Sequence, residues 1–226
     1  MTKKQSTPKT GTRSKAKTSS AQSPAAKAKF LAKTEATWQA LMDQYNAMSN
    51  YETSKAFEPA GSLLINALAE AEKFGETDDR LAETLLALAH QYRMARQFKE
   101  GEPLFRRALS MKEKLFGESS VQTAKVLSAL AWCLEFLNGS EQEKCLLRSL
   151  EIYKTTTGSD SKETARANEE LGHFYRARAQ KPADLDKVQT YFEESLRIWR
   201  QLEDMNGILG AKQWLEHIEK IRARLA

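Results

Sequence analysis

The strongest constraint on the fold is a stretch, Leu85 to Gly117, that recurs along the chain in diverged copies. Within it, Leu85, Leu88, Ala89 and Tyr92 are spaced so that all four lie on one stripe of a helix. Polar residues follow, and a second amphipathic segment ends at Gly117, a residue type that commonly ends helices. The apolar side of this second segment carries Phe105, Ala108, Leu109 and Met111. The stretch therefore predicts a helical hairpin.

Three further copies of this hairpin are visible. The sequence RALSMKEKLFG at 107–117 aligns with RSLEIYKTTTG at 148–158, 41 residues further on. The first-helix stripe recurs as Trp38, Leu41, Met42 and Tyr45, as Leu127, Leu130, Ala131 and Leu134, and as Asn168, Leu171, Gly172 and Tyr175. The second-helix stripe recurs as Leu64, Ala67 and Leu68 and as Phe192, Ser195 and Leu196. Four such hairpins predict a solenoid, because each buries its apolar stripe against its neighbours.

These stripes carry a family resemblance. The patterns Trp38-x-x-Leu41-Met42-x-x-Tyr45, Leu88-Ala89-x-x-Tyr92 and Leu171-Gly172-x-x-Tyr175 resemble tetratricopeptide (TPR) repeats. Their spacing of 41 to 46 residues exceeds the ~34 usual in that family and is similar to that of kinesin light chains and their bacterial relatives. The resemblance implies an all-α, right-handed superhelical solenoid of antiparallel helix hairpins. We expect a repeat domain over 30–226, with repeats at about 30–76, 77–117, 118–158 and 159–204 and a capping helix at 205–226.

Glycines and capping residues mark the expected repeat boundaries. Repeat ends are expected at Gly75, Gly117 and Gly158. The second repeat is expected to begin with Asp78 or Asp79 as the residue that caps its first helix. The next two repeats are expected to begin with pairs at capping-box spacing, Ser119 with Gln122 and Asp160 with Glu163.

Other segments fit between these boundaries. The first helix is expected to begin between Ala25 and Thr34 and to end near Ser49, before a loop through Asn50, Tyr51 and Pro59. The segment Gln180 to Lys187 is predicted to be a surface insertion, with a contact loop as the alternative. Near the end of the chain, Lys212 and Glu216 occupy places where a repeat has apolar or small residues, which suits a capping helix with one face in water.

The amino-terminal tail differs in composition from the rest. Up to Lys29 it contains eight basic residues and no acidic one, so the remaining chain carries a net charge of −3 against +5 for the whole. Residues 1–29 lack the apolar surface to offset chain entropy, which predicts disorder. Three roles are open: a solvated leader or tether, contact with nucleic acid or an anionic surface, and an organelle transit peptide.

The other face of the first helices predicts a partner-binding groove. In the resembled family, this other face of the first helices lines the concave groove. Here it carries apolar anchors and guanidinium groups, which suit a peptide with apolar and acidic side chains. The candidate groove residues are Leu86, His90, Arg93, Met94, Trp132, Phe136, Arg166, His173 and Arg176. The alternative for Trp132 and Phe136 is that they pack against the adjacent first helix.

The groove lacks one feature of the resembled repeats. Their first helices resemble Leu-Asn-Asn-Leu-Ala, in which paired asparagines can grip a peptide backbone. This chain has LLALA at 85–89, LSALA at 127–131 and NEELG at 168–172. A ligand would therefore be held mostly by side-chain pockets and charge.

Motifs for catalysis, cofactors or metals are not found in the sequence. There is no glycine-rich phosphate loop, nucleophile elbow or paired-carboxylate site, and the pairs Asp78-Asp79 and Glu169-Glu170 are interpreted as capping or solvated charge. His90 and His173 lie two repeats apart, too far to share a metal readily. Cys133 and Cys145 are expected on facing helices of the third repeat as reduced, partly buried thiols, with a regulatory disulfide as the alternative.

The predicted function is that of a non-catalytic adaptor or scaffold binding a partner protein or peptide in its groove, without a cofactor. The longest apolar runs fall short of the ~20 residues that cross a bilayer, so we expect a cytoplasmic protein. One alternative is a protein that binds nucleic acid or an anionic surface through its tail, with the repeats as a platform. Another is a regulator that responds to a peptide signal.

Overall fold

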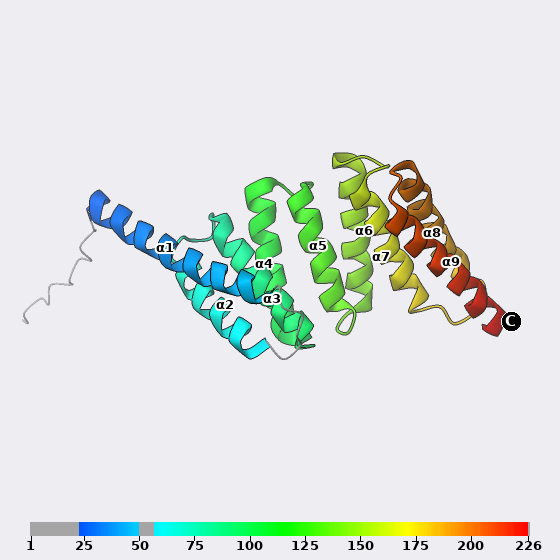
Figure 1. The fold of residues 1–226 in the computed structure, drawn as a ribbon, viewed down its shortest axis with the longest axis horizontal. Helices are drawn as coiled ribbons and strands as arrows, with labels where there is room; N and C mark the ends of the chain where they lie inside the picture. Colours follow the sequence, from blue (N-terminus) through cyan, green and yellow to red (C-terminus); the bar gives the residue numbers. More distant parts are fainter. Residues whose placement is uncertain (1–22, 50–56, 226) are drawn as a thin grey trace, which may run out of the picture.

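The computed structural model describes residues 23–49 and 57–225, and within these ranges the regular secondary structure is α-helical, joined by short turns (Figure 1). The basic segment 1–22 and the loop through Asn50 and Tyr51 lie outside the described residues. The helices are α1 (Pro24–Ser49), α2 (Phe57–Ala71), α3 (Asp79–Met94), α4 (Phe98–Phe116), α5 (Val121–Leu134), α6 (Gly139–Thr156), α7 (Lys162–Arg176), α8 (Asp184–Gln201) and α9 (Met205–Leu225).

The helices form a row of antiparallel hairpins in chain order. The pairs α1–α2, α3–α4, α5–α6 and α7–α8 pack as hairpins, and each second helix also packs on the first helix that follows it, ending with α8 on α9. Figure 1 shows the hairpins side by side from α1 at one end to α9 at the other. The predicted all-α repeat fold is confirmed.

The apolar stripes form the core, as their spacing predicted. Leu85, Ala89 and Phe105 are fully buried in the second repeat, and Leu130 and Ala131 are almost fully buried in the third. In the first repeat the stripe of α1, from Trp38 to Tyr45, is only half-buried, because the end of the row has a neighbour on one side. At about 25 cal/mol per Å² of apolar surface, this burial is the main stabilising term.

A glycine corner joins each of the first three hairpins to the next helix. Gly75, Gly117 and Gly158 have φ of +92°, +92° and +99°, a region of backbone conformation that residues other than glycine rarely adopt. The backbone N–H three residues later, at Asp78, Ser120 and Ser161, donates to the glycine carbonyl at 3.1, 3.3 and 3.2 Å. The predicted glycine stops are confirmed.

The same third residue caps the next helix. Asp78 accepts from the N–H of Arg80 at 3.0 Å, as predicted. The predictions that Ser119 and Asp160 begin the next two repeats as caps were each wrong by one residue. The caps are Ser120 and Ser161, which accept from the N–H groups of Thr123 and Thr164 at 3.1 and 3.2 Å. The glycine corner fixes this position: each threonine hydroxyl donates back to the glycine carbonyl at 2.8 Å, which leaves Ser119 and Asp160 exposed.

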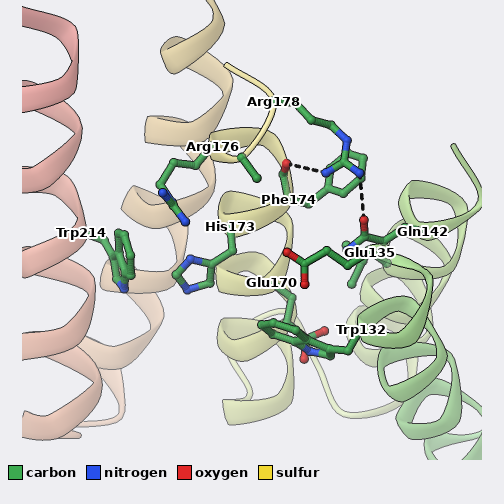
Figure 2. A pocket seen from close by; sticks show the side chains of 11 residues that line it. Trp132, Glu135, Gln142, Glu170, His173, Phe174, Arg176, Arg178 and Trp214 are labelled. Atoms are coloured by element: carbon green, nitrogen blue, oxygen red, sulfur yellow. Dashed lines mark hydrogen bonds between the residues drawn. The ribbon is translucent and has the colours of Figure 1, made fainter. Parts of the chain in front are cut away.

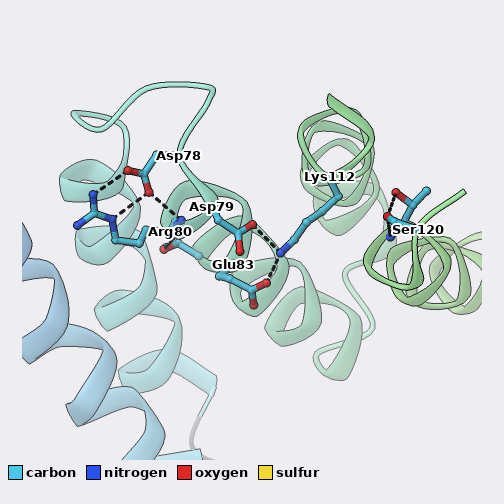
Figure 3. A network of polar contacts seen from close by, with 8 residues as sticks. Asp78, Asp79, Arg80, Glu83, Lys112 and Ser120 are labelled. Carbon is cyan, nitrogen blue, oxygen red and sulfur yellow. Dashed lines mark hydrogen bonds and ion pairs between the residues drawn. The ribbon is translucent and has the colours of Figure 1, made fainter. Parts of the chain in front are cut away.

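Charged groups stabilise the junction between the first two repeats and the packing within the second repeat (Figure 3). The guanidinium of Arg80 binds Asp78 through two hydrogen bonds of 2.9 and 2.7 Å and lies 3.7 Å from the ring centroid of Phe74. Lys112 is 3% exposed, and its Nζ binds Asp79 at 2.7 Å and also Glu83. The buried ammonium group is thereby compensated by two carboxylates.

One ion pair recurs between successive second helices. Arg107 of α4 pairs with Glu72 beyond α2, and Arg148 of α6 pairs with Glu113 of α4 at 2.7 Å. Both pairs link positions 35 residues apart.

Two predicted boundaries need correction. Residues 24–29 were assigned to the disordered tail, but α1 begins at Pro24 because Ser23 accepts from the N–H of Ala26 at 3.3 Å and proline suits a first helical position. The insertion predicted for Gln180 to Lys187 is shorter. The carboxylate of Asp184 accepts from the N–H groups of Gln180 and Lys181, and α8 begins at Asp184.

The last helix has one face in water, as predicted. Lys212 and Glu216 are exposed and do not face the array. The stripe that packs on α8 runs through Ile208, Ala211, Leu215 and Ile218, at helical spacing. The helix begins after Asp204, which accepts from the N–H of Gly207 at 3.0 Å.

The cap assignment can be tested with two neighbouring serines. Replacing Ser120→Ala removes the cap of α5 and should lower the free energy of unfolding by about 1 kcal/mol, measured by urea denaturation. Ser119→Ala is the matched control and should have almost no effect, because Ser119 is exposed. A larger loss for Ser119→Ala would contradict the corner described above.

A substitution at Gly172 tests how closely α7 and α8 pack in the fourth repeat. A Cβ on Gly172 would lie 2.6 Å from the ring of Phe192, which is fully buried. We expect Gly172→Ala to destabilise the fold by about 1–3 kcal/mol. At Gly210, within α9, a Cβ would meet nothing within 4 Å, so Gly210→Ala should leave stability unchanged or raise it by up to about 1 kcal/mol. Thermal unfolding of both variants distinguishes these outcomes.

Candidate functional site

The structure divides the candidate groove residues among separate places. Three of them, Trp132, His173 and Arg176, line one pocket between the third repeat, the fourth repeat and α9 (Figure 2). We call it the Trp132 pocket, and its volume is about 180 Å³. Its lining residues are Trp132, Glu135, Gln142, Leu146, Glu170, His173, Phe174, Arg176, Ala177, Arg178 and Trp214.

Trp132 forms one side of this pocket. It lies in the last turn of α5, where the helix presents it towards α7, and it remains 40% exposed. The corresponding position in the second and fourth repeats is occupied by His90 and His173. A large, partly exposed indole on a rigid helix provides apolar contact area at low entropic cost.

An aromatic cluster forms the opposite side. The ring of His173 makes T-shaped contacts with the rings of Phe192 and Trp214, at centroid distances of 5.2 and 4.5 Å. Phe192 and Trp214 also stack at 5.8 Å. Burial, together with the charge of Arg176, lowers the pKa of His173 from its ordinary 6.5, so this imidazole is neutral at physiological pH.

The two arginines of the pocket differ in how far they are already bound. Arg178 donates to the carbonyl of Phe174 at 3.1 Å and to Gln142 at 3.0 Å, and its guanidinium lies 3.9 Å from the Phe174 ring centroid. Arg176 lies over Trp214 at 4.9 Å. Its buried Nε has no hydrogen-bond partner.

Two carboxylates lie on the Trp132 side of the pocket (Figure 2). Burial raises the pKa of Glu170 above its ordinary 4.5, although Ser128 and Trp132 favour the ionised form. One oxygen of Glu170, Oε2, is buried without a hydrogen-bond partner. Glu135 follows the last residue of α5 and is half-buried. Burial of the Glu170 Oε2 atom without a hydrogen bond is energetically unfavourable.

The prediction that Glu169 and Glu170 are solvated was wrong. Glu169 accepts from the hydroxyl of Ser195 at 2.8 Å and from the indole N–H of Trp199 at 2.7 Å, which ties α7 to α8. Glu170 lies in the pocket instead. Because an α-helix has 3.6 residues per turn, the side chains of adjacent residues point in different directions. Each of these two carboxylates nevertheless contacts other parts of the protein.

Two other groove candidates line a second pocket. Leu86 and His90 lie with Lys112 and Lys125 around a volume of about 270 Å³ between α3, α4 and α5. The His90 ring meets Phe105 edge-on at 5.1 Å, which repeats the contact of His173 with Phe192. Burial, with a contribution from Arg93, lowers the pKa of His90 as well.

The remaining candidates line neither pocket. Phe136 stacks on Phe98 at 4.6 Å and lies under Arg96 at 5.3 Å, so it packs on α4 of the preceding hairpin and not on a first helix. Met94 is 69% exposed. Arg166 is exposed, and Arg93 has a buried Nε without a hydrogen-bond partner.

The sequence contained signals for two residues that were missed. Glu170 replaces Ala87 and Ala129 of the preceding repeats, and a small residue at equivalent positions indicates a crowded environment. Trp214 lies on the same face as Ala211 and Ile218, whose spacing reveals the inner side of α9. Gln142, Phe174 and Arg178 had no such signal, because they reach the pocket from the tips of the hairpins.

The two cysteines are buried free thiols. The Cys133 thiol donates to the carbonyl of Phe98 at 3.2 Å. Burial raises the pKa of both thiols to about 11, which keeps them protonated and weakly reactive at neutral pH. The expectation of reduced, buried thiols matches this arrangement.

The described residues contain neither a metal-binding cluster nor a membrane-spanning helix. Over 23–49 and 57–225, no group of three His, Cys, Asp or Glu side chains is placed to hold a metal ion. Within the same ranges no helix has the length and apolar character needed to cross a bilayer.

The fold and the pocket define a helical-repeat protein. Residues 80–143 match the sequence model of the tetratricopeptide repeat. No curated protein matches the chain in sequence. The solved structure of BtubC (BKLC) from P. vanneervenii is 17% identical with a TM-score of 0.61, and the match covers 87% of this chain and 92% of that one. A putative kinesin light chain of Podosopora anserina with nearly identical TPR-like repeats is 17% identical with a TM-score of 0.59, covering 83% and 97%.

These similarities confirm the resemblance seen in the sequence. The chain contains tetratricopeptide repeats over 80–143, and the array as a whole has the fold of kinesin-light-chain-like repeat proteins. Tetratricopeptide repeats generally mediate contacts between proteins, and proteins built from them are generally scaffolds without catalytic activity.

The electrostatic state of Glu170 gives a prediction for stability. Because its pKa is raised in the folded protein, its stabilising contribution is present below its ordinary pKa of 4.5 and is lost as the pH rises through the folded value. Glu170→Gln removes the charge and keeps the shape. The variant should therefore gain thermal stability over the wild type at neutral pH and less, or none, in acid. An equal difference at both pH values would contradict the burial of this carboxylate.

Proposed function

We propose that the protein is a non-catalytic adaptor that binds a segment of a partner protein, with the Trp132 pocket as the place where one side chain of that segment anchors. The observation that carries this proposal is the pocket itself. It combines the partly exposed ring of Trp132 with buried polar atoms of Glu170 and Arg176 that have no protein partner. Such atoms gain most when a ligand supplies the missing hydrogen bonds.

The size of the pocket favours a peptide over a small molecule. Pockets for drug-sized ligands and cofactors have about 300–1,000 Å³, whereas the Trp132 pocket has about 180 Å³. This volume suits one anchoring side chain. The rest of the partner segment would then contact the surface of the neighbouring repeats, where the pocket of Leu86 and His90 offers a second place for a side chain.

The rigidity of the lining supports the same function. Trp132, His173 and Trp214 come from three helices whose positions are fixed by buried contacts between repeats. Rigid aromatic side chains in a preformed pocket lower the entropic cost of binding and are frequent among the residues that dominate binding energy. We place this activity in the cytoplasm, because the free thiols of Cys133 and Cys145 suit a reducing compartment.

A selection from a random peptide library tests the proposal. Peptides selected on the full chain should lose affinity when Trp132→Ala removes the indole, by ~2 kcal/mol or about thirtyfold in Kd measured by fluorescence anisotropy. Phe136→Ala is the matched control, since this aromatic residue lies in the turn just after α5 but packs outside the pocket.

The control should bind the selected peptides with unchanged affinity. The proposal fails if no peptide is selected, or if Trp132→Ala, with thermal unfolding showing that it is folded, binds them as tightly as the wild type. Equal losses for both variants would also contradict it, because they would show a general effect on the third repeat.

A further inference from the structure

We infer that the anchor taken by the Trp132 pocket is a positively charged side chain, lysine or arginine, held between the indole of Trp132 and the carboxylates of Glu135 and Glu170. This inference rests on the proposed function and specifies the chemistry of the partner segment.

Two carboxylates of the pocket have no cationic partner in the described part of the chain. Glu135 and Glu170 lie on the Trp132 side of the pocket, and no ion pair joins either of them to a described residue. Ser128 and Trp132 hydrogen-bond the carboxylate of Glu170, while its Oε2 atom stays buried without a hydrogen bond. Nearby Glu169 adds negative charge while its own oxygen is occupied by Ser195 and Trp199.

The two arginines that line the pocket are bound away from these carboxylates. Arg178 is held by Gln142 and by the carbonyl and ring of Phe174. Arg176 lies over Trp214 on the opposite side of the pocket from the two carboxylates (Figure 2). Neither arginine therefore neutralises the half of the pocket that Trp132 forms.

A cationic anchor suits this half of the pocket better than an acidic or an aliphatic one. A carboxylate next to Trp132 would meet two like charges in a partly desolvated site. An aliphatic side chain would cover Glu170 and leave its buried oxygen unsatisfied, at a cost in affinity. A lysine or arginine supplies the donors, compensates the charge and places a cation against the exposed ring of Trp132.

This inference differs from the expectation from sequence, in which the groove arginines favour acidic side chains in the partner. That expectation placed Arg93, Arg166 and Arg176 beside Trp132. The structure leaves Arg93 and Arg166 out of the pocket and puts Arg176 against Trp214. Glu135 and Glu170 are therefore the charged groups that line the Trp132 side of the pocket, and Arg166 acts on Glu170 from outside it.

Nuclear magnetic resonance of the tryptophan indoles tests the inference directly. The probes are five blocked pentapeptides, acetyl-Gly-Gly-X-Gly-Gly-amide with arginine, lysine, glutamine, glutamate or leucine at X, titrated into the ¹⁵N-labelled full chain. Trp132 and Trp214 line the pocket, whereas Trp38 and Trp199 donate to Thr84 and Glu169 and serve as internal references. The arginine and lysine peptides should shift the Trp132 indole signal, and the other three should shift it much less.

Charge removal provides the matched variants. Glu135→Gln and Glu170→Gln should each weaken binding of the arginine peptide by about tenfold, as expected for a contact to a charged group. Glu216→Gln, on the exposed face of α9, is the control and should leave binding unchanged. The spectra of the free variants verify that each one is folded.

The outcomes separate this inference from the proposed function. A Trp132 shift with the glutamate or leucine peptide that equals or exceeds the arginine shift overturns the cationic anchor and leaves the adaptor function standing. Unchanged affinity of Glu170→Gln and Glu135→Gln for the arginine peptide also overturns it, and so does the absence of any shift. If the library-selected peptides are independent of Trp132, the proposed function itself fails.

Discussion

The whole structure depends on the stacking of helical hairpins against one another. A single hairpin such as α3–α4 has an apolar stripe that it cannot bury by itself, so its stability comes from the hairpins on either side. The glycine corners set how one hairpin follows the next, because positive φ at Gly75, Gly117 and Gly158 and the cap three residues later fix the entry of each new helix. The pocket exists only because three successive elements are stacked in this way.

The sequence predicted most of the fold because repeated spacing is a strong signal. The stripes of Leu85 and Leu127 recur in register, and glycine has a clear physical role at the end of each repeat. Prediction failed where a contact between distant residues decided the outcome. The cap is Ser120 and not Ser119 because the carbonyl of Gly117 selects the third residue. The inner face of α9 is set by its packing on α8, which the repeat register did not reveal.

The candidate site was less predictable than the fold for the same reason. The periodic pattern brought Trp132, His173 and Arg176 to one face, and the structure places all three in one pocket. It could not show that Phe136 turns to Phe98 or that Trp214 from the last helix completes the pocket. It also could not show that one carboxylate oxygen of Glu170 is buried without a hydrogen bond. Charge and hydrogen bonding at the site therefore follow from the stacking of repeats and not from any single motif.

A crystal structure of the full chain with a library-selected peptide is the most direct test of the central claim that the Trp132 pocket anchors a partner segment. The account predicts a peptide side chain between Trp132 and Trp214, with a cationic group in hydrogen-bond contact with the carboxylate of Glu170 or Glu135. A peptide bound on another surface, with the Trp132 pocket containing only water, would contradict it.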